Sequence, residues 1–527
     1  RGRLRARGLL AGGGGDADAL GDGGGQLVVA IRAEPAQLNP LVDQGSGAHS
    51  VRPALDSLVW DNGDGTHAPW LASSWEVSDD ATTYVFHLRK DVHFHDGTPF
   101  NAAAVKANFD YVNNPANKST GSTAKLKPVA TVIDEYTVSV KLGTPESSFL
   151  TLIAAPYFGI LSQQQIEQDP KSLATKLIGT GPFKFDSWVK GQSLTYVRND
   201  DYQWAPAQFH AGAAYLDSVK YVFLPEDQTR YNALTTKEAH VVDYIAPEYA
   251  KSVKQSADYQ NEEFLLPGVG YSLHFNTRRA PFDKLEVRQA LLHGLNREEI
   301  VASATFGAYP VQEYLASTTP DFNKELKNKI SYDADKANRL LDEAGWTLGA
   351  NGLRQKDGQE LVLTAYESLP QPQNKETLQL VAQQWGKLGV KLNVLAGDAG
   401  SKTLDSLDPA KTPVAPGMVG RADPDVIKSN YYPTNRNVLL QKGGVSQKVN
   451  SFVDDKLNGL LDAIAAETDA AKRLQLTGDV QRYLIAQAYV IPIFEEPQAF
   501  AGATTVKDVG FEAVGRPSFY ATWLAKP

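Results

Sequence analysis

Hydrophobic and polar residues alternate over a stretch in the first fifth of the chain. Tyr84, Phe86 and Leu88 fall on one side of an extended backbone, and the residues between them fall on the other side. This is the two-residue period of a half-buried strand. Val92 and Phe94 continue the alternation and predict a second strand.

A turn and a helix start follow these two strands. Asp96-Gly97 is a typical tight-turn pair, and Asn101 has the side chain of a helix cap. Val105 and Phe109 follow at helical spacing. The pattern therefore predicts a hairpin that leads into a helix.

The rest of the chain alternates between the strand period and the helix period. A hairpin is predicted at 131–142, with Asp134-Glu135 as its turn, and Asn296 and Glu299 have the spacing of a capping box. Further strands are predicted at 26–32, 178–196, 215–224, 241–245, 270–276, 390–395 and 490–494, and helices at 227–237, 285–292, 333–344, 378–388 and 457–464. Such alternation favours an α/β protein.

Length and composition limit the class of protein. A chain of 527 residues is too long for one hydrophobic core, so two or three domains are expected. The net charge of -9 argues against a nucleic-acid partner, because phosphate binding needs a basic surface. The absence of cysteine excludes thiol catalysis, disulfides and cysteine-ligated metal sites.

Residues 1–26 are basic and then glycine-rich, which predicts a disordered tether or a processed N-terminus. Leu10-Ala11-Gly12 resembles the end of a lipoprotein processing motif, in which a cysteine follows, but Gly13 stands there. Two interpretations stay open: a lipid anchor whose cysteine has been removed, or a chance likeness.

Three polar residues at or beside the Asp96-Gly97 turn suggest a metal site. His93 and His95 fall on one face of a strand beside Asp96, and two imidazoles with a carboxylate can ligate a transition metal. The alternative is a structural turn, which we favour, so neither a metal nor another cofactor is expected. The chain has no H-E-x-x-H, G-x-S-x-G or P-loop motif, and no catalytic residues are assigned.

The stretch from Pro69 to Phe109, PWLASSWEVSDDATTYVFHLRKDVHFHDGTPFNAAAVKANF, closely resembles the signature of the family 5 extracellular solute-binding proteins. These are the peptide- and nickel-binding receptors of bacterial ABC importers. Further segments resemble the family in the family's order, at 178–185, 198–202, 275–291, 332–346, 460–473 and 491–493.

The resemblance implies an α/β, two-lobed fold like that of periplasmic binding proteins (type II, similar to cluster C), with an extra α+β subdomain. Lobe one would take residues 27–57, 178–272 and 495–527, the extra subdomain 58–177, and lobe two 273–494. Ligand would lie in the cleft between the lobes and be buried on closure.

The function implied is that of an extracytoplasmic receptor, not an enzyme. It would capture a short peptide or peptide-like solute and deliver it to ABC permease subunits, and it is expected to be a monomer. A metal chelate of the nickel type is the alternative ligand, and an exported hydrolase is the alternative class of protein.

Seven residues are candidates for ligand contact. In peptide-binding relatives, an Asp of a similar loop pairs with the ligand's α-amino group, so Asp423 or Asp425 would do so here, and Arg421 would serve a ligand carboxylate instead. Tyr271 begins the strand that enters lobe two. The remaining candidates lie in a loop of lobe one: Gly45, Ser46 and His49. The alternatives are a turn closed by Asp side chains, and packing by Tyr271.

Overall fold

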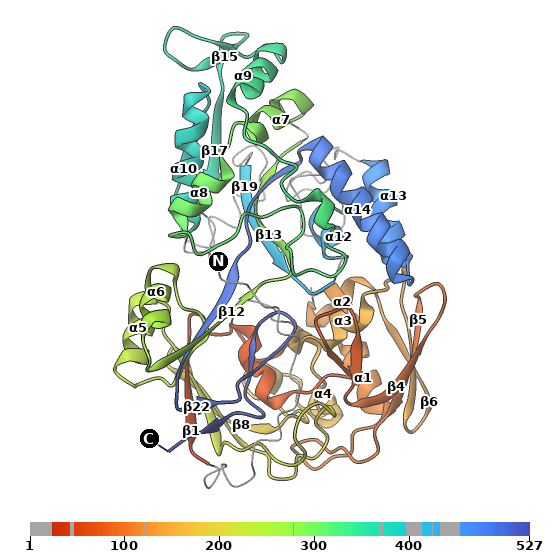
Figure 1. The fold of residues 1–527 in the computed structure, drawn as a ribbon. Coiled ribbons are helices and arrows are strands. Elements are labelled where there is room, and N and C mark those ends of the chain that lie inside the picture. Colours follow the sequence, from red (N-terminus) through yellow and green to blue (C-terminus); the bar gives the residue numbers. More distant parts are fainter. Residues whose placement is uncertain are drawn as a thin grey trace. The chain divides into compact units, whose positions relative to one another are not determined.

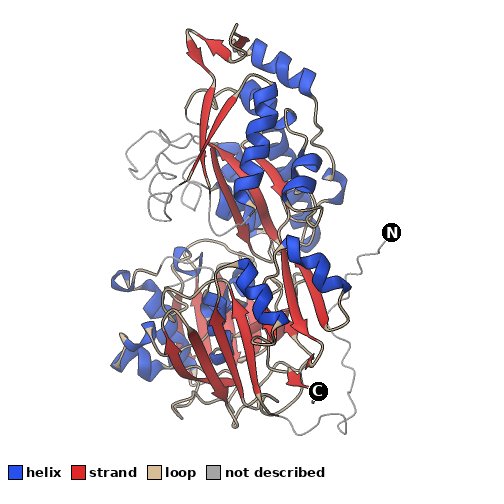
Figure 2. Cartoon of the chain, turned by 90° about the vertical axis from the view of Figure 1, so that its left-hand side faces the viewer, coloured by secondary structure: helices blue, strands red, loops and turns tan. Residues whose placement is uncertain are grey.

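The computed structural model describes residues 24–42, 47–119, 122–277, 279–367, 373–396, 414–423, 425–432 and 454–526. The chain forms two compact units. Unit 1 runs to Phe264 and resumes at Gln498, and unit 2 spans Leu265–Pro497. Strands and helices alternate in both (Figures 1 and 2), which confirms the α/β class.

The main sheet of unit 1 has seven strands in its described part. Their order is β12 (Tyr259–Leu265), β21 (Pro497–Ala503), β11 (Val241–Val242), β1 (Gln26–Ile31), β10 (Ser218–Phe223), β9 (Ser193–Arg198) and β8 (Phe183–Val189). Strand β1 is parallel to both of its neighbours, β10 and β11. The strand between β12 and β11 is thus formed by residues that follow unit 2 in the sequence.

Unit 1 also contains an antiparallel sheet, in the order β4 (Ala72–Val77), β5 (Thr83–Leu88), β7 (Thr137–Lys141) and β6 (Val129–Asp134). The predicted alternation in β5 is confirmed, because Tyr84, Phe86 and Leu88 are all buried. The predicted hairpin is β6 and β7. Helix α1 (Ala102–Asn113) begins as predicted, because Asn101 Oδ1 accepts a hydrogen bond from the Ala104 N–H at 3.1 Å.

The predicted second strand at Val92 and Phe94 is wrong as an element, although both side chains are buried. Only one bridge forms there, between His93 and Pro99. The backbone closes on its own turn, with the Phe94 N–H donating to the Thr98 carbonyl at 2.9 Å and the Phe100 N–H to the Val92 carbonyl at 3.1 Å. The pairing extends no further, since the His95 N–H donates to the Gly179 carbonyl at 2.9 Å.

The other elements of unit 1 are short. Its helices are α2 (Ser122–Lys125), α3 (Phe149–Ala154), α4 (Gln163–Gln168), α5 (Asp227–Thr235) and α6 (Pro247–Gln255). Its paired short strands are β2 (Val59–Asp61) with β3 (His67–Pro69), β22 (Val506–Lys507) with β25 (Trp523–Leu524), and β23 (Gly510–Phe511) with β24 (Pro517–Ser518).

Unit 2 is built on a five-stranded sheet in its described part, in the order β18 (Lys391–Leu395), β17 (Val362–Tyr366), β19 (Val414–Gly420), β13 (Gly268–Phe275) and β20 (Val490–Phe494). Every residue of β13 is buried, as expected for a central strand. A smaller sheet joins β14 (Thr347–Leu348), β15 (Arg354–Lys356) and β16 (Gln359–Glu360).

The helices of unit 2 are α7 (Leu285–His293), α8 (Arg297–Ala304), α9 (Ala334–Glu343), α10 (Asn374–Lys387), α12 (Val426–Tyr431), α13 (Asp455–Ala466) and α14 (Ala470–Gln487). The last two run side by side (Figure 1). Asn296 caps α8 as predicted, with Oδ1 accepting from the Glu299 N–H at 3.1 Å. In a complete capping box the Asn296 N–H would donate to the Glu299 side chain, but here it donates to Gln384 of α10 at 2.7 Å.

Candidate functional site

The loop between β19 and α12 holds three of the predicted ligand residues. Arg421 pairs with Asp423 through two hydrogen bonds, from Nε to Oδ2 at 2.8 Å and from Nη2 to Oδ1 at 2.6 Å. Arg421 Nη1 donates to Ser429 Oγ at 2.6 Å. Asp425 Oδ2 lies 4.0 Å from Arg421 Nη2. The charge of the buried Asp423 is therefore compensated within the loop.

A glycine of β13 fixes the start of this loop. The Arg421 N–H donates to the Pro267 carbonyl at 3.0 Å. The neighbouring Gly268 has φ +117°, and a Cβ there would lie 2.3 Å from the Val419 carbonyl oxygen and 2.9 Å from the Arg421 nitrogen. Only glycine fits this close approach of two backbones.

Tyr271 lies in the interior of unit 2. Its ring stacks on Phe494 of the neighbouring strand β20, with 4.5 Å between the ring centroids. Its hydroxyl donates to Asn374 Oδ1 in the first turn of α10. The ring therefore serves packing, while the hydroxyl links β13 to the start of a helix.

The first turn of α10 has unsatisfied hydrogen-bonding groups. Gln373 Oε1, Asn374 Nδ2 and Thr377 Oγ1 are buried and have no hydrogen-bond partner within the described chain. A buried polar group without a partner costs about 1–3 kcal/mol, so such groups mark places where water or a ligand binds. The positive end of the helix dipole adds to the attraction for an acceptor.

Sequence reasoning missed this turn, although the sequence contains a signal for it. Asn374 and Thr377 share a helix face with Leu378 and Val381, which belong to the apolar stripe that predicted the helix. Polar side chains on a buried stripe need hydrogen-bond partners. Asn374 and Thr377 are therefore recognisable in the sequence as candidate site residues.

Three ligand residues were predicted in unit 1, namely Gly45, Ser46 and His49, and the structure describes His49. It lies on a short 3₁₀ helix (Ala48–Ala54), and its Nε2 is 3.1 Å from Oδ2 of Asp243, which directly follows β11. Strands β1 and β11 are parallel, and ligands of α/β sheets bind at the carboxyl ends of such strands. Gly45 and Ser46 lie outside the described residues.

The same edge of the sheet carries a cationic group. Arg32 follows β1, and its guanidinium lies over the Tyr244 ring at 4.6 Å from the centroid. Asp243 Oδ1 is buried without a hydrogen-bond partner among the described residues. This edge offers both charges to a polar solute, which makes it the candidate surface of unit 1.

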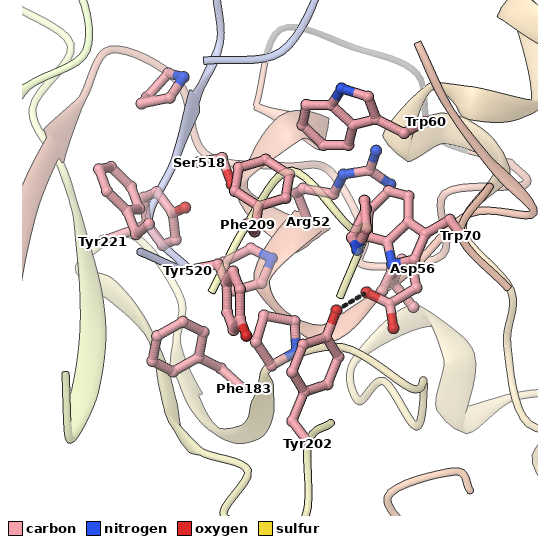
Figure 3. Close-up of a pocket in the computed structure, with 16 residues that line it drawn as sticks. Arg52, Asp56, Trp60, Trp70, Phe183, Tyr202, Phe209, Tyr221, Ser518 and Tyr520 are labelled. Atoms are coloured by element: carbon pink, nitrogen blue, oxygen red, sulfur yellow. Dashed lines mark hydrogen bonds between the residues drawn. The ribbon is translucent and has the colours of Figure 1, made fainter. Parts of the chain in front are cut away.

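Figure 3 shows a separate pocket of unit 1 with mostly aromatic walls. Among the side chains that line it are Trp60, Trp70, Tyr202, Phe209 and Tyr520. The cavity measures about 40 Å³. That volume holds a few water molecules, whereas ligand pockets usually measure about 300–1,000 Å³. The pocket is too small for a dipeptide.

One carboxylate at this pocket is fully buried. Asp56 Oδ2 accepts hydrogen bonds from Thr180 at 3.0 Å and Trp204 at 2.9 Å. Its Oδ1 accepts one from Tyr202 at 3.3 Å, which Figure 3 marks with a dashed line. Burial raises the pKa of Asp56 from 3.8 to about 6, against the opposing effects of these donors and of Arg52. Asp56 therefore titrates near neutral pH.

The described histidines near the Asp96-Gly97 turn make their contacts within unit 1. His95 Nε2 lies 2.9 Å from the Gly181 carbonyl oxygen, and burial lowers the pKa of His95 to about 4. His87 is 3.4 Å from Glu76 at the surface. Across the described ranges, no group of three or more histidine, aspartate or glutamate side chains is placed to hold a metal ion.

None of the described helices combines the length and apolar character that crossing a membrane requires.

Comparison with known proteins gives a consistent result. The family model of bacterial extracellular solute-binding proteins, family 5 (middle region), matches residues 66–438, which is more than half of the chain. A dipeptide-binding protein of Escherichia coli (strain K12) is 27% identical over 445 residues, covering 80% of this chain and 79% of that protein.

A glutathione-binding protein of Pectobacterium atrosepticum is 30% identical over 340 residues, which cover 64% of this chain. The match spans 62% of that relative, less than two thirds of its length. Among solved structures, NikA from Brucella suis in complex with Fe(III)-EDTA matches with a TM-score of 0.81 and 26% identity. That match covers 95% of this chain and 100% of NikA.

Proposed function

Because the chain belongs to family 5 of the bacterial extracellular solute-binding proteins, we propose that it captures a short peptide or peptide-like solute outside the cytoplasm. It would deliver this solute to the permease subunits of an ABC importer, as a monomer and without chemical change. Attachment by a lipid anchor belongs to the same proposal.

The observation that carries the proposal is the first turn of α10. Asn374 Nδ2 and Thr377 Oγ1 are buried donors without partners in the described chain, and the Tyr271 hydroxyl orients Asn374. A peptide carboxylate or carbonyl supplies the acceptors that these groups lack. The dipeptide- and glutathione-binding relatives support this class of solute.

A metal chelate is the second candidate solute. NikA, at 26% identity, holds Fe(III)-EDTA, and the carboxylates of such a chelate would satisfy the same donors. Capture between the two lobes, followed by closure, stays a prediction of the family resemblance, and compaction on ligand addition in small-angle scattering tests it.

The ligand itself is identified by native mass spectrometry of the purified protein followed by denaturation. A peptide released unchanged supports the proposal, a released metal chelate supports the second candidate, and turnover of a peptide or sugar by the pure protein refutes the receptor function. Isothermal titration with the released compound then gives the affinity of each variant.

Thr377→Val tests the site itself. This change removes a buried hydroxyl that has no partner among the described residues, so it should stabilise the ligand-free protein and yet weaken binding by about tenfold. Thr305→Val is the matched control. The Thr305 hydroxyl donates to the Val301 carbonyl at 2.7 Å, so its loss should destabilise the protein and leave the affinity unchanged. Unchanged affinity in Thr377→Val would remove the turn from the site.

A further inference from the structure

We propose that Arg421 determines which charge the solute can present to the β19–α12 loop, because it closes Asp423 to a ligand's ammonium group. The inference rests on the proposed function and deepens it. It predicts that solutes with a blocked or absent amino group bind as well as solutes with a free one.

Arg421 already holds both carboxylate oxygens of Asp423. Both carboxylate oxygens accept from Arg421, at 2.8 and 2.6 Å, in the two-pronged arrangement that fits a guanidinium best. Asp423 is 2% exposed and Arg421 15%, so the pair is largely removed from water. A buried carboxylate needs a charge partner, and the chain itself supplies it.

The position of Arg421 is fixed from two further directions. Its backbone N–H bonds Pro267, and its remaining guanidinium nitrogen bonds Ser429 of α12 at 2.6 Å. An arriving ammonium would have to displace a guanidinium that makes three hydrogen bonds, two to Asp423 and one to Ser429. It would also approach a like charge at close range, which is unfavourable.

Asp425 is the other carboxylate of the loop, and it has a different setting. Its Oδ2 lies 4.0 Å from Arg421 Nη2, beyond hydrogen-bond distance. If Asp425 were an ammonium partner, selectivity for a free amine would depend on Asp425 and not on Asp423. The experiment separates these two cases.

The test compares alanyl-leucine with its N-acetyl form by isothermal titration. The wild type should bind both with affinities that differ by less than about tenfold, the effect expected of one charge-assisted hydrogen bond. Arg421→Ala should gain about tenfold preference for the free amine, and Arg421→Lys, which keeps a cation, should not. A wild-type preference for the free amine that is lost in Asp423→Asn or Asp425→Asn would overturn the proposal.

Arg473→Ala is the matched control. Arg473 Nε bonds Asp321 Oδ2 at 2.7 Å, with both side chains similarly shielded, so this variant also breaks a partly buried ion pair of unit 2. It should lose stability without gaining any preference between the two peptides. The same gain in both variants would show a general loosening and would refute a specific role of Arg421.

A measurement that needs no peptide separates this inference from the proposed function. If the wild type binds neither peptide, alanyl-leucine is not its solute, and the Arg421 inference is judged by chemical rescue. Methylguanidinium should raise the melting temperature of Arg421→Ala more than that of the Arg421→Ala/Asp423→Asn double variant, because only the former offers an uncompensated carboxylate. Equal shifts would overturn the inference.

Discussion

Asp56→Asn should make the stability of unit 1 less dependent on pH. Asp56 is fully buried beside the aromatic pocket, and its pKa in the folded protein is about 6. Asparagine has nearly the same shape, so its Oδ1 can accept from Thr180 and Trp204, while its Nδ2 donates to the Tyr202 hydroxyl. The substitution removes the ionisation and little else.

The size of the effect follows from the pKa. The folded protein holds the Asp56 proton more tightly than the unfolded chain does, since the pKa rises from 3.8 to about 6. The stabilisation by the proton is fully present below about pH 4 and is lost as the pH rises through about 6. A difference of about 2 in pKa corresponds to about 3 kcal/mol. At about pH 7 the asparagine variant should therefore be the more stable protein, by up to about 3 kcal/mol.

The assay is urea unfolding of both proteins from about pH 4 to about pH 7, with hydrogen exchange of the segments around Thr180 and Trp204 to report on unit 1. Asp79→Asn, which removes an exposed carboxylate, corrects for the change in net charge. The stability difference between Asp56→Asn and the wild type should grow with pH in favour of asparagine. A difference that stays constant over this range would refute the reasoning.

Three more predictions concern single residues. Although burial raises the pKa of Asp96, hydrogen bonds from Ser162 and Thr98 lower it overall. Asp96→Asn should therefore destabilise the protein at neutral pH, and by progressively less as the pH falls through the pKa of the folded state. The same urea series measures this effect. Phe306 is 73% exposed with φ +53°, so Phe306→Gly should raise the free energy of unfolding by about 1 kcal/mol, and a lower melting temperature would contradict this. Gly268→Ala should destabilise unit 2 by more than about 3 kcal/mol, which soluble expression and thermal melting will show, because its Cβ meets the Val419 carbonyl.

Local patterns of the sequence predicted local structure well. The strand at Tyr84–Leu88, the caps Asn101 and Asn296 and the hairpin β6–β7 depend on residues within a few positions of one another, and all are confirmed. The strand at Val92 and Phe94 was wrong because this segment pairs only across its own tight turn, while the neighbouring His95 N–H bonds Gly179, more than 80 residues away.

The candidate site could be predicted only in part, for the same reason. That Arg421 and Asp423 lie in one loop is visible in the sequence, but their pairing depends on side-chain directions that the sequence leaves open. The partner of Tyr271 is Asn374, 103 positions later, and this contact depends on how a strand and a helix pack. The polar residues on the apolar stripe of α10 are visible in the sequence, but their lack of hydrogen-bond partners within the described chain is known only from the packing.

The placement of β21 has a consequence for how the protein is made. Synthesis proceeds from the N-terminus, so unit 2 emerges from the ribosome before the strand that lies between β12 and β11 in the sheet of unit 1. Until residue 497 has been made, β11 and β12 have open edges that invite pairing with other chains. Prematurely terminated chains therefore keep an unfinished sheet, and cellular proteases can distinguish them from the full-length product.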